Sequence, residues 1–202
     1  MLLERWLPVT ADFGLIHLPV DTAHEHGVRP CAETQSLDAM EIPSEVLAFR
    51  AAAERFCAWA EAAPENPEED LYLAMRHVSE LYALALAMPG ADLDPSVAHQ
   101  FVDKSDHKAV YARFSRLPLQ YYGEVFDTTL LPPEEPTVGD LADDLLDIYT
   151  DIKAGLLHFA NGHAPQAVFQ WKFTWGIHWG RHATSALRAM HGWRTRVEQG
   201  GA

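Results

Sequence analysis

Two histidines near the end of the chain, His178 and His182, have the type and spacing best suited to chemistry. On a helix, side chains four residues apart lie one turn apart on the same face and can converge on one point. Imidazole is the commonest protein ligand of divalent metals. The helical metalloprotease motif, however, needs a glutamate directly after the first histidine, and Trp179 stands there. The sequence therefore excludes that protease class and leaves the rest of the site open.

An acidic segment earlier in the chain offers partners for these histidines. Its aspartates recur every three or four residues, which places them on one stripe of a helix. They are Asp140, Asp144, Asp147 and Asp151. Only a short loop separates this segment from the histidine helix, so the two helices are expected to be antiparallel neighbours.

Two arrangements fit this pairing of an acidic and a histidine stripe. In the one we favour from sequence, Asp–His and Asp–Arg pairs fix the register of the two helices, and no cofactor is bound. This implies a structural or interaction role. In the alternative, His178 and His182 bind a divalent metal together with Asp144 or Asp147, as facing helices in bundles do. The alternative predicts that these four side chains converge on an accessible cavity.

A third hypothesis places a small-molecule pocket beside the histidines. Its candidate residues are Trp175, Arg181, Tyr149 and Asp151. An indole, a phenol and a guanidinium are suited to a nucleotide, because rings stack and guanidinium groups bind phosphate.

The histidines lie in the last long helical run, residues 165–191, which carries three of the six tryptophans. Bulky residues share one side of this run. The next side has small residues at Gly176, Gly180 and Ala183. Each glycine inside a helix costs about 1 kcal/mol relative to alanine, so we expect a partner backbone to approach closely there. The run is predicted to be one continuous central helix.

Four other helical segments are predicted from apolar residues at alternating three- and four-residue spacing. They cover residues 43–63, 67–88, a broken stretch over 95–117, and 137–160. Asn66 and Pro67 form a helix start, and Thr137 is expected to cap the last of the four. A short aromatic helix is expected at residues 121–126. No segment shows credible strand alternation, which predicts an all-α bundle of about five main helices.

The domain organisation follows from where this periodicity begins and ends. Residues 1–41 contain prolines and glycines without sustained periodicity, so we expect an irregular N-terminal arm. The bundle is assigned to residues 42–193, and residues 194–202 to a disordered tail. His24, His26 and Cys31 in the arm lack the fourth ligand that a structural zinc site needs.

The amino-acid composition limits the kinds of binding partner and the cellular compartment that we expect for this protein. The 202-residue chain has 29 acidic against 15 basic residues and a net charge of −14, which disfavours nucleic acid and membrane surfaces as partners. Only two cysteines occur, so we expect free thiols and a cytoplasmic protein. Cys57 falls within an apolar stripe and is interpreted as a core residue. A protein partner or a homo-oligomer remains open.

Several blocks of the chain resemble the bacterial family of domains of unknown function numbered 5063. They are residues 121–127, 138–145, 147–149, 152–153, 171–173, 177–183 and 186–189. The resemblance spans about residues 43–191 and implies an all-helical bacterial protein, without implying a reaction. The histidine pair is also similar to that of four-helix metal proteins of the damage-inducible B type. That resemblance implies a third histidine ligand, for which His77 and His158 are both open.

Overall fold

The computed structural model describes residues 42–64 and 66–200, and most of these residues are helical. The helices are α1 (Ser44–Glu61), α2 (Pro67–Ala87), α3 (Lys104–Phe114), α4 (Leu141–Ala160), α5 (Ala164–Ile177) and α6 (Trp179–Glu198). Two short strands, β1 (Tyr121–Glu124) and β2 (Thr137–Asp140), pair antiparallel. The predicted all-α class is confirmed, with one small β-ribbon added. The expected arm, and with it His24, His26 and Cys31, lies outside the described residues.

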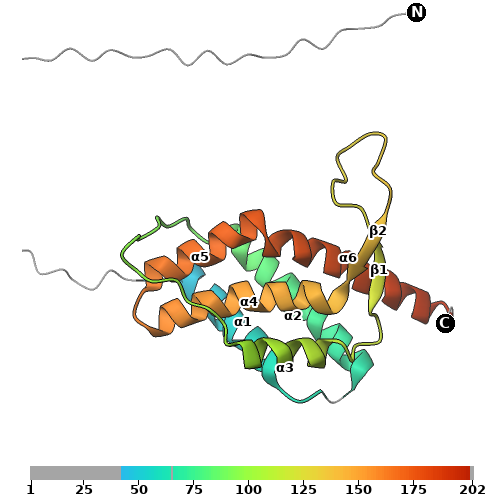
Figure 1. Ribbon diagram of the computed structural model, residues 1–202, viewed down its shortest axis with the longest axis horizontal. Coiled ribbons are helices and arrows are strands. Elements are labelled where there is room, and N and C mark those ends of the chain that lie inside the picture. Colours follow the sequence, from blue (N-terminus) through green and yellow to red (C-terminus); the bar gives the residue numbers. More distant parts are fainter. Residues whose placement is uncertain (1–41, 65, 201–202) are drawn as a thin grey trace, which may run out of the picture. The chain divides into compact units, whose positions relative to one another are not determined.

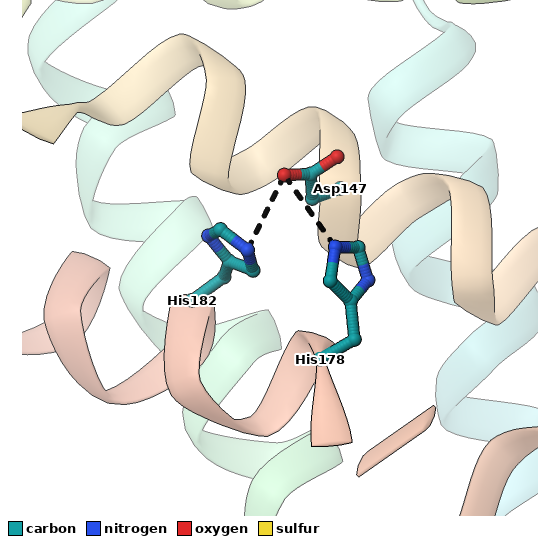
Figure 2. A group of neighbouring side chains, drawn as sticks. All are labelled: Asp147, His178 and His182. Carbon is teal, nitrogen blue, oxygen red and sulfur yellow. Dashed lines mark ion pairs between the residues drawn. The ribbon is translucent and has the colours of Figure 1, made fainter. Parts of the chain in front are cut away.

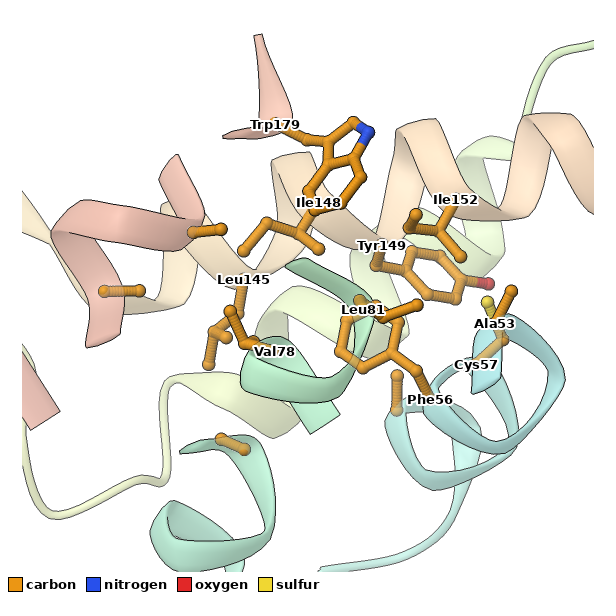
Figure 3. Packing of buried hydrophobic residues seen from close by; sticks show 14 of the residues in the cluster. Ala53, Phe56, Cys57, Val78, Leu81, Leu145, Ile148, Tyr149, Ile152 and Trp179 are labelled. Carbon is orange, nitrogen blue, oxygen red and sulfur yellow. The ribbon is translucent and has the colours of Figure 1, made fainter. Parts of the chain in front are cut away.

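Helix α4 is central to the packing, since α1, α3, α5 and α6 all contact it (Figure 1). Its apolar face is fully buried at Leu145, Ile148 and Ile152. Phe56 of α1 and Leu81 of α2 lie in the same cluster (Figure 3). Burying a side chain of this size contributes about 1.5–3 kcal/mol. The apolar face therefore holds α4 in the bundle, while its aspartate stripe faces a different set of neighbours.

The first residues of α2 and α4 show which of the predicted helix caps are correct. Asn66 caps α2 by accepting hydrogen bonds from the backbone N–H groups of Glu68 and Glu69, as predicted. The predicted cap at Thr137 is wrong. Asp140 caps α4 instead, by accepting from the N–H of Ala142 at 2.9 Å. Thr137 belongs to β2, where pairing with β1 keeps the backbone extended up to the cap.

The aromatic helix expected at residues 121–126 is also wrong, because β1 occupies most of that segment. Tyr122 lies opposite Gly139 in the ribbon. An ideal Cβ on Gly139 would lie 2.5 Å from Cζ of Tyr122, so a larger residue at position 139 would collide with this ring. Strands of four residues are too short to show alternation, which explains why the periodicity did not reveal them.

The continuous helix predicted over residues 165–191 is interrupted at His178. This residue has φ −140° and ψ −87°, ends α5 and precedes α6. The break lets Trp179 enter the core, where it is fully buried and donates from Nε1 to the carbonyl of Trp171 at 3.1 Å. Helix α6 follows directly after α5, with a bend between the two (Figure 1).

Gly180 makes this break sterically feasible. A Cβ on Gly180 would collide with the backbone carbonyl oxygen of Trp175, in the turn before the break. Gly176, by contrast, has open space around it. The expected glycine groove for a partner backbone is therefore wrong at both positions. One glycine admits its own chain, and the other is surrounded by solvent.

Two further expectations concern the end of α6 and Cys57. The disordered tail is wrong for residues 194–198, which continue α6 and include an Arg194–Glu198 ion pair of 2.7 Å. Cys57 is buried in the core, and burial raises the pKa of its thiol, so it is unsuited to act as a nucleophile. Within the described residues, every helix is too short or too polar to cross a lipid bilayer.

Candidate metal centre

His178, His182 and Asp147 bring their side chains to one point between α4 and the start of α6 (Figure 2). Oδ2 of Asp147 lies 3.3 Å from Nε2 of His182 and 3.9 Å from Nε2 of His178. One ligand atom from each residue lies within 4.8 Å of the other two. Among the residues that the structure describes, no other group of three such side chains meets this criterion.

The other nitrogen of each imidazole is held by its own carboxylate. Nδ1 of His178 lies 2.8 Å from Oδ2 of Asp151, and Nδ1 of His182 lies 2.8 Å from Oδ1 of Asp144. A carboxylate acceptor favours the tautomer with the proton on Nδ1. The lone pair of neutral histidine is then on Nε2, the atom that faces Asp147. The α4 aspartates thus have two roles in this geometry. Asp144 and Asp151 orient the imidazole rings, and Asp147 faces the point between the two Nε2 atoms.

Asp144 is itself held by a residue outside the helices. The hydroxyl of Tyr122 donates to Oδ2 of Asp144 at 2.5 Å, leaving Oδ1 for His182. Asp144 is buried, so this second bond satisfies a carboxylate that solvent hardly reaches. Together with Gly139, which admits its ring, Tyr122 therefore forms an outer layer of the centre.

The electrostatics of the centre are dominated by carboxylates. The hydrogen bond to Asp144 raises the pKa of His182 against the opposing effect of burial. Burial raises the pKa of Asp151, and its hydrogen bond to His178 counteracts this shift. Asp143, beside the centre, has its pKa raised by burial and by the charge of Asp147. The shifts of His182 and Asp143 thus include the charge of neighbouring aspartates, whereas that of Asp151 comes first from burial.

Access to the centre is partial. The side chain of His178 is 41% exposed and that of Asp147 is 30% exposed, whereas His182 is 15% exposed. The imidazole rings of the two histidines are 4.9 Å apart and meet nearly edge to face. The shared point is therefore bounded by protein on the α4 and α6 sides and open to solvent beside His178.

The residues expected in one small-molecule pocket are separated. Tyr149 is fully buried and donates to Glu61 of α1 at 2.9 Å. Trp175 packs against Tyr82 of α2. Arg181 lies over the ring of Phe126, at 5.5 Å from its centroid. Of these four candidates, Asp151 is the one whose side chain pairs with a histidine of the centre.

Neither histidine offered as a third ligand joins the centre. His77 packs against Trp59 with ring centroids 5.4 Å apart, and His158 is fully buried in the bundle. The third group is Asp147. Sequence reasoning missed Tyr122, whose only signal was the glycine that stands opposite it in a ribbon too short to predict.

Comparison with known proteins bears on family and fold. Residues 40–195 match the family model described as Domain of unknown function (DUF5063). The structure is similar to the crystal structure of protein BF1032 from Bacteroides fragilis, with a TM-score of 0.61 and 20% identity. That match covers 73% of this chain and 90% of the other, and at this identity it shows the fold alone. No curated protein matches the chain.

Proposed function

The chain belongs to the DUF5063 family, and from the geometry between α4 and α6 we propose that it is a divalent-metal-binding domain. The ligands are Nε2 of His178, Nε2 of His182 and a carboxylate oxygen of Asp147. Two imidazoles and one carboxylate form a donor set suited to Fe²⁺, Mn²⁺, Co²⁺, Ni²⁺ and Zn²⁺. Three protein ligands leave coordination positions for water or substrate, as metal sites that support catalysis do.

The observation that carries this proposal is the third carboxylate. In a purely structural role, which we call a structural lock, Asp–His pairs only fix the register of α4 and α6. Such a lock needs one aspartate for each histidine, and Asp151 and Asp144 already supply these at 2.8 Å. Asp147 is surplus to those pairs, yet it faces both Nε2 atoms. With both histidines in the neutral form that binds a metal, the carboxylates of Asp144, Asp147 and Asp151 leave the cluster with a net negative charge. A bound divalent cation compensates that charge at the point where the free lone pairs meet.

The arrangement of orienting groups supports the same conclusion. Metal-bound histidines almost always donate their second ring N–H to a carboxylate, a carbonyl or water, which sets the tautomer and raises ligand basicity. Both histidines have such a carboxylate partner, and one of those partners is held in turn by Tyr122. Oδ2 of Asp147 lies 3.3 Å from Nε2 of His182 and 3.9 Å from Nε2 of His178. Two atoms that bind one metal ion, each at about 2.0–2.2 Å from it, are separated by a similar distance.

Metal titration of tag-free protein tests the proposal. Protein treated with EDTA is expected to bind one equivalent of Co²⁺ or Zn²⁺ and to be stabilised, because an ion that binds only the folded state adds about 2.7 kcal/mol at 100 times its Kd. Elemental analysis gives the stoichiometry, and the visible spectrum of bound Co²⁺ reports its ligands. Protein that binds no equivalent and keeps its melting temperature in every metal would leave the structural lock as the function.

Replacing Tyr122 with phenylalanine tests the outer layer of the centre. The variant keeps the ring against Gly139 but loses the hydroxyl bound to Asp144, so the carboxylate that orients His182 becomes free to turn. We expect the Kd for Zn²⁺ to rise about tenfold, the lower end for loss of an outer partner. Competition with a chromophoric chelator measures this change.

Tyr111→Phe is the matched control for that substitution. The Tyr111 hydroxyl lies 3.4 Å from Asp140, a helix cap that does not orient either histidine. Its removal should leave the Kd within about twofold, since an exposed bond of this length is weak. Equal effects of the two substitutions would argue against an orienting role for Tyr122.

A further inference from the structure

A groove lies between β1 and α6, close to the metal centre but lined by other residues. Its volume is about 420 Å³, within the range of small-molecule sites. Tyr122 is one of the residues that line the groove, and its hydroxyl is bound to Asp144. The metal-centre residues His178, His182 and Asp147 do not line it. The groove is therefore a separate site that shares one wall with the centre.

Three arginines of α6 line this groove: Arg181, Arg188 and Arg196. None of them forms an ion pair with another described residue, although the protein is strongly acidic. Four other described arginines do find a carboxylate partner. They are Arg50, Arg55, Arg113 and Arg194. Three guanidinium groups without an ion pair among the described residues thus lie along this one groove, where they are available to an anionic ligand.

Exposed aromatic rings accompany these charges. Tyr121 is 66% exposed and Phe126 is 54% exposed, and both line the groove together with Trp193. An aromatic ring exposed to this extent loses little when water is replaced by a planar ligand stacked on it. The groove thus combines surfaces for stacking with donors for a multiply charged anion.

One carboxylate in the groove further limits the chemical classes of ligand that fit it. Glu124 is held by the hydroxyl of Ser185, which donates to its Oε1 at 2.7 Å. A fixed carboxylate repels phosphate but accepts hydrogen bonds from hydroxyl or amino groups. The ligand must then carry donors at one end and negative charge at the other.

We propose that the groove binds a nucleoside phosphate, with the phosphates on the α6 arginines, the base on the aromatic wall and a ribose hydroxyl or base amino group on Glu124. This class of molecule combines a planar ring, hydroxyl donors and two or more negative charges. Guanidinium groups pair with phosphate oxygens through two parallel hydrogen bonds. The site does not depend on the metal centre, because none of its contacts involves the three metal-binding side chains.

Calorimetric titration with ADP in the presence of EDTA tests this proposal apart from the metal. The full-length protein is expected to bind one equivalent of ADP and to bind adenosine at least tenfold more weakly. Arg188→Ala should raise the Kd for ADP about tenfold or more, as expected for loss of charge-assisted hydrogen bonds. Tyr121→Ala should weaken ADP more than inorganic pyrophosphate, since only ADP has a ring to stack.

Arg76→Ala is the control for the change in net charge. Arg76 is an exposed arginine of α2 outside the groove, so its removal should leave the Kd for ADP within about twofold. The proposal fails if ADP does not saturate, or if Arg188→Ala and Arg76→Ala weaken it equally. It also fails if a glutamate-rich peptide binds the groove and ADP does not displace it, because the partner would then be an acidic protein.

Discussion

Replacing His182 with asparagine is expected to raise the Kd for the first equivalent of Zn²⁺ at least 100-fold, while metal-free protein keeps most of its stability. Asparagine places an N–H donor near the position of Nδ1, so the hydrogen bond to Asp144 is retained and Nε2 alone is lost. Loss of an outer partner costs about 10–100-fold in affinity, and loss of a direct ligand costs more. Chelator competition measures the Kd, and urea unfolding of EDTA-treated protein measures the stability.

The two measurements separate the metal site from a structural lock. A lock resides in the His182–Asp144 hydrogen bond, so asparagine at position 182 would leave it intact and His182→Ala would break it. His107→Ala removes an exposed histidine of α3 and should leave the Kd unchanged within about twofold, since His107 is outside the cluster. Zinc binding that survives in both His182 variants would place the metal elsewhere, and the proposed ligand set would be wrong.

The sequence allows only part of this site to be predicted. Helical spacing predicts that His178 and His182 face one way and that the aspartates form a stripe, and the structure brings these stripes together. The spacing does not say which aspartate meets which nitrogen. That assignment depends on the break at His178 and on the rotation of α6 that follows from burying Trp179, and neither has a local signal beyond Gly180.

The fold, too, could be predicted only where local sequence signals determine it. Long periodic segments with strong caps, such as α2 after Asn66, follow from local chemistry. The errors lie where tertiary contacts override local preference. The ribbon is one case, because strands of four residues are fixed by pairing with each other. The interior of the last helix is the other, because burial of Trp179 outweighs the continuity of the helix.

Gly155 shows the same dependence on tertiary contacts, because volume added there meets a buried side chain. This glycine lies within α4, and a Cβ placed on it would overlap the indole of Trp171. That ring is fully buried and donates from Nε1 to the carbonyl of Ile152 at 2.9 Å. Phe49 of α1 packs against it with ring centroids 5.0 Å apart. The indole therefore has no free direction in which to move away from a methyl group.

Gly155→Ala is expected to lower the free energy of unfolding by about 2–3 kcal/mol. Added volume in a packed core costs about 1–3 kcal/mol, and the Trp171 hydrogen bond adds about 1 kcal/mol if the ring must shift. This loss outweighs the gain of up to about 1 kcal/mol that alanine brings to a helix. Gly176→Ala is the matched control: nothing lies within 4 Å of its added Cβ, so it should be neutral or stabilising by up to about 1 kcal/mol. Urea unfolding of both variants measures the difference, and equal stabilities would mean that Trp171 is not confined as described.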